Sequence, residues 1–370
     1  MASDRLSARR LNRALLARQL LLERNDSPIL DTVRHLVGLQ AQEPLDPYTA
    51  LWSRLDSFDP DDLGKLLIDR KVVRIVAMRA TVHLLAADDC LELRPMMQEV
   101  LDKELRLHQQ HRSHLAGLDL APVISHAREL LAEQPRTMSS LREELGTAFP
   151  DLNAAALAYA MRNHLPLVQI PPRGVWGQSS QVRYANAEDW LGRPASDTPS
   201  PEQMVLRYLA AFGPAAAADV AAWSRLTGMR DVIEQVQPQL QTFTDDRGRT
   251  LVDLPDAPRP DADTPAPPRF LPQFDNVLLS HKDRTRIISD DDRPIANEIA
   301  PFKGHVLYDG FWTGVWSIDR DGAAAILTIE HARPLTAPAE QEIGEEGTAL
   351  LHLHARDAEN REVRFVRAAP

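Results

Sequence analysis

The sequence predicts an α+β protein in which three winged helix-turn-helix units follow one another and precede a C-terminal β-rich module. Two observations predict this fold class. Helices followed by a pair of strands recur three times, and a Pro- and Asp-rich segment separates the third recurrence from a run of short strands. At 370 residues the chain is also longer than one hydrophobic core usually becomes. We place the units at 1–118, 119–198, 199–258 and 259–370.

The first unit is expected to open with helices and close with a hairpin. Ser7 can cap a helix that runs to about Arg24, and Pro28 suits the first turn of a second helix. Gln40 and Gln42 fall where that second helix is expected to end. A third helical segment is expected around 48–55, and strands are expected over 72–76 and 81–85.

The same plan is expected twice more, although the units share negligible sequence identity. In the second unit the helices are 121–133, 139–145 and 153–163, and the strands are 167–170 and 181–184. In the third unit the helices are 201–212, 215–226 and 230–240, and a wing has its tip at 246–248. After a solvated linker at 256–268, the C-terminal module is expected to contain an apolar strand-like segment at 271–279, strands at 306–308, 313–318 and 324–329, and a helix near 337–353.

Composition restricts the classes of function. A net charge of −11 argues against extensive coating of nucleic acid, but basic residues gather locally and could line a basic groove. These clusters are Arg5, Arg9, Arg10, Arg13 and Arg18; Lys103, Arg106 and Arg112; and Lys282, Arg284 and Arg286. The single cysteine, Cys90, excludes an intramolecular disulfide and a multi-thiolate metal site, so we expect a cytoplasmic protein. We expect no membrane role, because no stretch has the form of a signal peptide or the length of a membrane span.

Four segments are the most informative. They are 38–44 (GLQAQEP), 78–84 (MRATVHL), 271–284 (LPQFDNVLLSHKDR) and 306–316 (VLYDGFWTGVW). Alone, each has a bland reading, since a glutamine pair is usually a polar helix end and alternating polar residues are usual on a half-exposed strand. Together, in this order, they resemble the AlkZ/YcaQ family of bacterial winged-helix DNA glycosylases. The resemblance extends from Leu11 to about Trp316.

The resemblance implies a C-shaped arrangement of the units and catalysis without a metal or an organic cofactor. It also implies that Gln40 and Gln42 are catalytic, in the Gln-apolar-Gln form of the AlkZ branch rather than the Gln-apolar-Asp form of the YcaQ branch. The implied activity is hydrolysis of the N-glycosidic bond of bulky N7-alkylated purines, extending to interstrand crosslinks, in DNA repair or self-resistance to a genotoxic natural product. The implied partner is double-stranded DNA with such lesions, bound by a monomer in an open groove.

Two amides are compatible with this chemistry. Alkylation at N7 makes guanine a cationic leaving group, so the remaining barrier is dominated by charge that develops on the deoxyribose and that oxygen dipoles stabilise. We assign Gln42 to positioning the attacking water, and Gln40 to orienting that water or stabilising the sugar. An amide is too weak a base to act as a true general base. Glu43 is the neighbouring carboxylate, but on a helix it would point about 100° away from Gln42.

Further contacts with DNA are expected from three groups of residues. They are Arg79, Thr81 and His83, beside the glutamines or the DNA backbone; Lys282, Arg284 and Arg286, on phosphates; and Tyr308, Phe311 and Trp312, on a hairpin turn in the minor groove. Each group has a structural alternative. The histidine can be satisfied in the core, the cations can lie on a solvated loop, and the aromatic residues can belong to the core.

Two other classes of function fit the same fold. A transcription regulator would bind DNA through recognition helices without catalysis. The residues available there for base readout are few, namely Asn153, Arg162, Asn163, Arg230 and Gln235. A protein-interaction scaffold would show no affinity for DNA even at low salt. Release of free alkylated base from damaged duplex separates a glycosylase from both.

Overall fold

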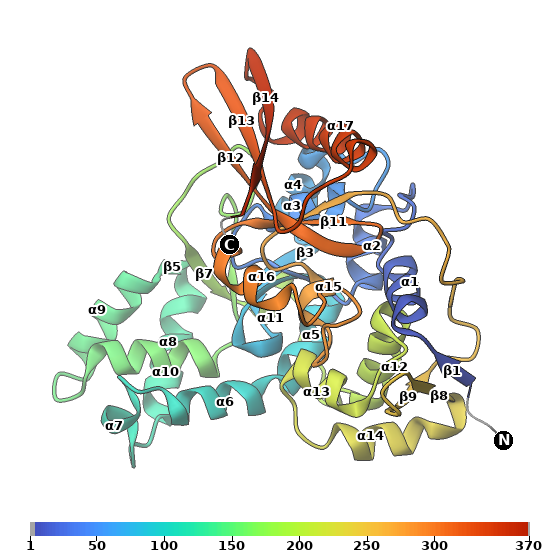
Figure 1. Ribbon diagram of the computed structural model, residues 1–370. Coiled ribbons are helices and arrows are strands. Elements are labelled where there is room, and N and C mark those ends of the chain that lie inside the picture. The colour runs from blue at the N-terminus through green and yellow to red at the C-terminus, as the bar shows by residue number, and fades with distance from the viewer. Residues whose placement is uncertain (1–3, 369–370) are drawn as a thin grey trace.

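The computed structural model describes residues 4–368 and is a mixed α+β protein (Figure 1). The first three and last two residues of the predicted outer units lie outside the described range. In Figure 1 the C-terminal module lies at the top, the second unit extends to the lower left, and the third unit occupies the lower right. The unit boundaries themselves stay a prediction.

The first unit contains a helix, a short strand, two helices and a hairpin. Its elements are α2 (Ile29–His35), β2 (Leu39–Gln40), α3 (Asp46–Trp52), α4 (Pro60–Ile68), β3 (Val72–Val76) and β4 (Val82–Ala86). The first strand pairs with the last, so the sheet order is β2-β4-β3. The predicted hairpin is confirmed, whereas α4 had not been predicted.

The second unit repeats this order of elements. Its elements are α8 (Ala121–Glu133), β5 (Arg136–Thr137), α9 (Met138–Ala148), α10 (Ala154–His164), β6 (Leu167–Gln169) and β7 (Arg183–Asn186). Its strand order is again first, third, second, and β6 pairs with β3 to join both units in one six-stranded sheet, β2-β4-β3-β6-β7-β5. Between and after them lie α5 (Ala87–Met96), α6 (Gln98–Leu107), α7 (Arg112–Leu115) and α11 (Ala187–Leu191).

The third unit has the same plan with a different addition. Its elements are α12 (Pro201–Phe212), α13 (Ala217–Ser224), α14 (Met229–Val236), the 3₁₀ turn η2 (Gln237–Gln239), β8 (Gln241–Asp245) and β9 (Thr250–Asp253). Ala215 bridges to Val252 of β9 in the place of the short first strand. The N-terminal strand β1 (Asp4–Leu6) adds in parallel to β8, and α1 (Ala8–Arg18) packs on α12. The N-terminus therefore packs with the third unit rather than the first.

The C-terminal module is a five-stranded sheet covered by one long helix. Its elements are β10 (Arg269–Leu271), α15 (Asn276–Leu279), α16 (Arg293–Ile299), β11 (Gly304–Tyr308), β12 (Phe311–Asp321), β13 (Ala324–His331), α17 (Ala337–His354) and β14 (Asn360–Arg367). The strands follow one another in the order β10 to β14. Ile343 and Leu350 of α17 are fully buried with Phe270 and Leu327 of the sheet, which makes a separate core. The predicted strand-like segment 271–279 is mostly loop and helix α15.

Two predicted helix ends are wrong. Ser7 caps α1 as predicted, but α1 ends at Arg18, not near Arg24, because Leu20 adopts a left-handed φ of 57° and turns the chain. Helix α2 ends at His35, and Gly38 follows with a φ of +87°. A Cβ at Gly38 would lie 2.3 Å from Leu85 Cδ2, so only glycine fits the backbone here. After Gly38 the chain is extended, and the glutamine motif lies on a strand instead of a helix end.

Two members of the basic N-terminal cluster, Arg13 and Arg18, are buried in the protein interior. Arg18 is 2% exposed and pairs with Asp253 of β9 at 2.7 Å. Arg9 and Arg13 each donate to a carbonyl oxygen of the 256–268 segment, at 2.7 and 2.6 Å. This segment had been predicted to be a solvated linker, but α1 anchors it. Removing one partner of such a buried ion pair is expected to be strongly destabilising.

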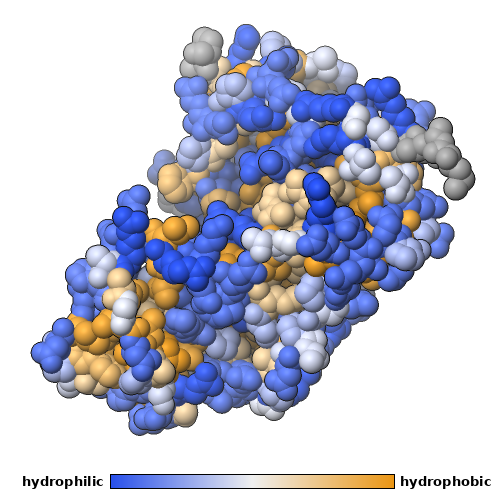
Figure 2. Space-filling model, turned by 90° about the horizontal axis from the view of Figure 1, so that it is seen from below, coloured by the Kyte–Doolittle hydropathy of each residue, from blue (hydrophilic) through white to orange (hydrophobic). Residues whose placement is uncertain are grey.

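Within residues 4–368 no helix is long and apolar enough to cross a bilayer. Figure 2 shows a largely hydrophilic face, with hydrophobic residues gathered on the lobe at the lower left.

Candidate active site

Gln40 is held inside the sheet by a fixed hydrogen bond. It lies on β2 opposite His83 of β4 and is 6% exposed. Its Oε1 accepts a hydrogen bond from Arg79 Nη2 at 2.7 Å. A guanidinium can only donate, so this contact determines which way the amide faces: the oxygen points to Arg79 and the NH₂ points away. Gln40 is therefore a preoriented amide.

Arg79 connects Gln40 to the third unit. It lies in the 3₁₀ turn η1 (Met78–Ala80) between β3 and β4, with a left-handed φ of 58°. Its Nη1 donates to the carbonyl oxygen of Trp223 in α13 at 2.9 Å. Burial, and then the nearby cations Arg225 and Arg284, lower the pKa of Arg79 to about 10. The group remains charged at neutral pH, so it can act as a permanent donor.

His83 is neutral and acts as an acceptor. Its Nδ1 lies 2.9 Å from the carbonyl oxygen of Thr81, which requires a proton on Nδ1 and leaves a lone pair on Nε2. Nε2 then accepts from Arg79 Nη2 at 3.1 Å. Burial, and then the charge of Arg79, lower the pKa of His83 to about 3. His83 is 1% exposed, so it supports Arg79 from behind, and its predicted contact with DNA is wrong.

Thr81 has a local structural contact. Its Oγ1 donates to the carbonyl oxygen of Met78 at 3.1 Å, which closes the turn that carries Arg79. The side chain is half-buried. Its predicted contact with DNA stays a prediction.

Gln42 is the exposed member of the motif. The antiparallel ladder continues one residue past β2, because Ala41 N donates to Val82 O at 2.8 Å. Ala41 is fully buried, whereas Gln42 lies at a bend directly after the ladder and is exposed. Its Oε1 is 3.4 Å from Val82 N, a long contact that a bound molecule can replace.

Asn276 fixes the backbone that leads into the motif. Its Nδ2 donates to Gly38 O at 2.9 Å and to Leu36 O at 3.3 Å. The preceding residue, Asp275, forms a fully buried ion pair with Arg54 at 2.8 Å. The sequence prediction missed this supporting role, although both residues belong to the quoted 271–284 segment.

One family of known proteins resembles this chain in sequence and in fold. A sequence model described as "DNA glycosylase AlkZ-like" matches residues 33–353. The chain belongs to the AlkZ-like DNA glycosylase family. The DNA glycosylase AlkZ of Streptomyces sahachiroi has a similar fold, with a TM-score of 0.79 and 18% identity over 98% of this chain and 100% of that one. No curated protein matches by sequence.

The residues that follow the AlkZ-like motif line an open pocket. Glu43, Pro44 and Leu45 face the loop 173–179 across a cavity of about 450 Å³. Asp46 lies one residue further on, at the start of α3, with Oδ2 buried and without a hydrogen-bond partner in the described chain. Burial, and then Glu43 and Asp275, raise its pKa to about 7. Glu43 is exposed and lies in a turn, so the helical geometry assumed for it does not apply.

The predicted phosphate-binding group of this AlkZ-like protein divides in two. Lys282 and Arg284 are exposed on the loop after α15. Arg286 is 3% exposed and donates through Nη1 to Pro214 O at 3.0 Å. The prediction for Arg286 is wrong, because the neighbouring Ile287 and Ile288 are buried in the core and carry it inward.

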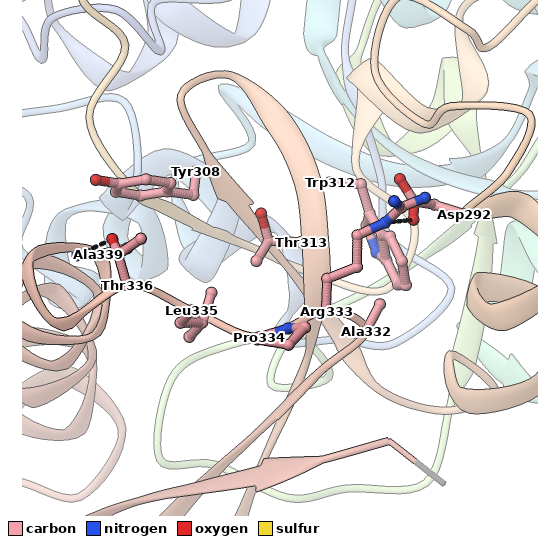
Figure 3. Close-up of a pocket in the computed structure, with 10 residues that line it drawn as sticks. All are labelled: Asp292, Tyr308, Trp312, Thr313, Ala332, Arg333, Pro334, Leu335, Thr336 and Ala339. Carbon is pink, nitrogen blue, oxygen red and sulfur yellow. Dashed lines mark hydrogen bonds and ion pairs between the residues drawn. The ribbon is translucent and has the colours of Figure 1, made fainter. Parts of the chain in front are cut away.

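The aromatic hairpin is also packed inside the protein. Trp312 is 3% exposed, and its Nε1 donates to His305 Nδ1 at 3.1 Å. The turn residue Asp309 pairs with Arg13 of α1 at 2.5 Å, which ties the turn to α1 while the Asp309 side chain remains 45% exposed. Tyr308 and Trp312 instead line a pocket of about 240 Å³ in the C-terminal module (Figure 3). The burial of Trp312 does not favour insertion of this turn into a minor groove, but Tyr308 and Phe311 are half-buried, so their contact with DNA stays a prediction.

Metal ligands do not gather in the described part of the chain. Among residues 4–368, no group of three or more His, Cys, Asp or Glu side chains could hold a metal ion. The candidate site of this AlkZ-like protein therefore consists of Gln40, Gln42 and the Arg79–His83 pair.

Proposed function

We propose that this protein is a monofunctional DNA glycosylase that hydrolyses the N-glycosidic bond of bulky N7-alkylated purines in duplex DNA, as a monomer without a metal or an organic cofactor. One observation carries the proposal. Gln40 lies on β2 with its amide oriented by Arg79, and Gln42, two residues further on, is exposed with only a long contact to the Val82 amide. A polar helix end, the bland interpretation of the motif, does not produce this arrangement.

The roles of the two glutamines follow from their contacts. The oxygen of Gln42 has only a long contact with the Val82 amide, so it can accept a hydrogen bond from the attacking water. Gln40 has its oxygen turned toward a cation, so it is suited to orient Gln42 and the water rather than to face the developing charge. We therefore assign water positioning to Gln42 and orientation to Gln40.

The reaction needs no strong general base. Water oxygen forms the new bond to C1′ of deoxyribose while the electron pair of the glycosidic bond leaves with the cationic alkylated base, which becomes neutral. The water proton passes to solvent. Preorganised dipoles that stabilise the cationic sugar are then the main contribution of the protein. This accounts for a site in which two amides take the place of carboxylates.

We interpret the three repeats as winged helix-turn-helix units at 1–118, 119–198 and 199–258, followed by the module at 259–370. The repeated strand order, first, third, second, supports this interpretation. The exposure of Gln42, directly after the edge strand β2, suits lesions that cannot be extruded into a closed pocket, including interstrand crosslinks. The protein then acts in DNA repair or in self-resistance to a genotoxic natural product.

The proposal is tested by base release. Duplexes carrying N7-methylguanine, a bulky N7 adduct or an interstrand crosslink are incubated with the protein, and free base and abasic sites are measured. We expect release of N7-alkylated bases that EDTA does not inhibit. Binding to all three duplexes without any abasic sites would contradict the proposal and indicate a DNA-binding regulator.

A further inference from the structure

A second group of arginines converges on Arg79 from other parts of the chain. Arg225 lies directly after α13, two residues beyond the carbonyl of Trp223 that Arg79 binds at 2.9 Å. Arg284 comes from the loop after α15, and this loop is tied to α13 because Lys282 N donates to Asp219 Oδ1 at 3.0 Å. Arg225 and Arg284 therefore come from segments that are attached next to Arg79, and both lie near enough for their charges to act on it.

The two outer cations have no anionic partner. The side chains of Arg225 and Arg284 are exposed, and neither makes a hydrogen bond or an ion pair within residues 4–368. The protein has more acidic than basic residues, and most arginines near carboxylates in this structure are paired, as Arg247 is with Asp290 at 2.8 Å. Like charges that lie near one another without a carboxylate repel one another. Such an arrangement of cations is stable only where solvent or a bound anion offsets the repulsion.

The backbone at two of these arginines is also unusual. Arg225 has a φ of 64° and Arg79 a φ of 58°, both in the left-handed region that disfavours side chains with a Cβ. Such conformations cost about 1–3 kcal/mol and persist at sites where the surrounding structure determines them. Arg284 is held differently, since its carbonyl oxygen accepts from Ile287 N and Ile288 N at 2.9 and 2.8 Å. All three side chains therefore extend from fixed backbone positions.

We propose that Arg225 and Arg284, together with Arg79, bind one phosphodiester of the DNA strand that carries the lesion, and that this phosphate holds Arg79 against Gln40. Arginine suits a phosphate because its guanidinium donates in a fork that matches two oxygens. Burial is the main cause of the lowered pKa of Arg79, and the bound anion would offset the further contribution of Arg225 and Arg284. DNA binding would thereby stabilise the donor that orients the catalytic amide, which makes Arg79 a positioning residue.

The inference rests on the proposed function, and its test begins with binding so that the two can fail separately. Affinity for an undamaged duplex is measured against salt for the wild type, Arg225→Gln, Arg225→Lys, Arg284→Gln and the Arg225→Gln/Arg284→Gln double variant. Loss of one phosphate contact reduces the slope of log K against log salt by about 1. Because both arginines are proposed to bind the same phosphate, we expect a reduction of up to about 1 for each Gln variant, no larger a reduction for the double variant, and a wild-type slope for Arg225→Lys.

The matched control is Arg364→Gln, which removes the same charge elsewhere. Arg364 is exposed on β14 and pairs with Glu362 at 2.9 Å, and in Figure 1 β14 is labelled at the top of the molecule and α13 near the bottom. It should leave the slope unchanged. A double variant whose slope equals that of Arg364→Gln, with an unchanged melting temperature, would overturn the proposal.

Replacing single phosphates with an uncharged group locates the phosphate that the arginines contact. Methylphosphonate is placed at one position at a time around an N7-methylguanine. One position should weaken binding to the wild type but not to the double variant, and single-turnover base release should fall for Arg225→Gln and recover in Arg225→Lys. If every position affects both proteins alike, the phosphate site is absent. If the binding results hold but the wild type releases no base, the phosphate site stands and the glycosylase proposal fails.

Discussion

Arg79 and Arg286 are both arginines of the segments that resemble the AlkZ/YcaQ family, yet they have opposite environments. Arg79 lies at a turn, joins Gln40 to α13 and is near two further cations. Arg286 is 3% exposed and donates to the backbone of Pro214. A segment that resembles a family therefore identifies a region of the protein, but it does not predict the direction in which each side chain points. A cation next to buried isoleucines supports the fold, whereas a cation on a turn between strands can serve the site.

The aromatic hairpin gives the largest expected effect. Replacing Trp312 with Ala removes a buried ring and its hydrogen bond to His305, and should lower the free energy of unfolding by about 3–5 kcal/mol. The folded fraction should keep the duplex affinity of the wild type. Urea unfolding and DNA titration test this together. If Trp312→Ala weakened DNA binding and left stability unchanged, Trp312 would belong to the DNA interface.

A substitution at Arg79, in the turn between β3 and β4, should change mainly the rate of base release. Replacing Arg79 with Met leaves Gln40 without its orienting donor, so base release should slow by up to about a hundredfold, the usual cost of a misplaced catalytic group. Arg286→Met serves as the matched change in the packed region and should lower stability instead. Single-turnover excision and thermal melting of both variants separate the two outcomes. If Arg79→Met and Arg286→Met changed the rate of base release and the melting temperature in the same way, the contrast between the two arginines would be wrong.

His83 predicts how stability changes with pH. Its pKa is about 3 in the folded protein and near 6.5 when unfolded, so between these values only the unfolded chain takes up the proton. Stability contributed by His83 is therefore complete above pH 6.5 and decreases as the pH falls, by about 1.4 kcal/mol per pH unit. His83→Gln keeps an acceptor for Arg79 and should give a shallower decrease between pH 6 and 4. An equally steep decrease in both proteins would show that His83 is charged in the fold.

Lys282 provides the smallest effect. It is exposed on the same loop as Arg284, so Lys282→Ala should reduce the salt slope of duplex binding by about 1 and leave the melting temperature unchanged. Adding Arg286→Met should not reduce the slope further. A second reduction would place Arg286 at the DNA.

Much of the element order could be predicted from the sequence, because periodicity and β-branched runs record local burial. The strand Val72–Val76 and the helices Ala121–Glu133 and Pro201–Phe212 have the predicted bounds. The long-range pairings could not be predicted. The parallel addition of β1 to β8 and the joining of β3 to β6 depend on contacts between segments that share no sequence signal.

The candidate site was predicted in its residues but not in its geometry. Gln40, Gln42 and Arg79 were found because short segments resembled a family, while the contact of Gln40 with Arg79 depends on the extended backbone after Gly38. Asn276 was within reach of the same resemblance, but its contact with the Gly38 carbonyl requires the folded chain. Arg225 had no sequence signal, since a lone arginine after a helix is a common feature of exposed turns.

The Gln42→Ala variant tests directly whether the glutamine pair performs the chemistry. Gln42 is exposed and makes one long contact, so its removal should leave the fold and the duplex affinity nearly unchanged. Single-turnover release of N7-methylguanine should slow by about two to three orders of magnitude, the usual cost of losing one preorganised transition-state contact. Gln40→Ala should slow release as well, and Gln42→Asp should retain activity. Release at the wild-type rate by folded Gln42→Ala would contradict the account.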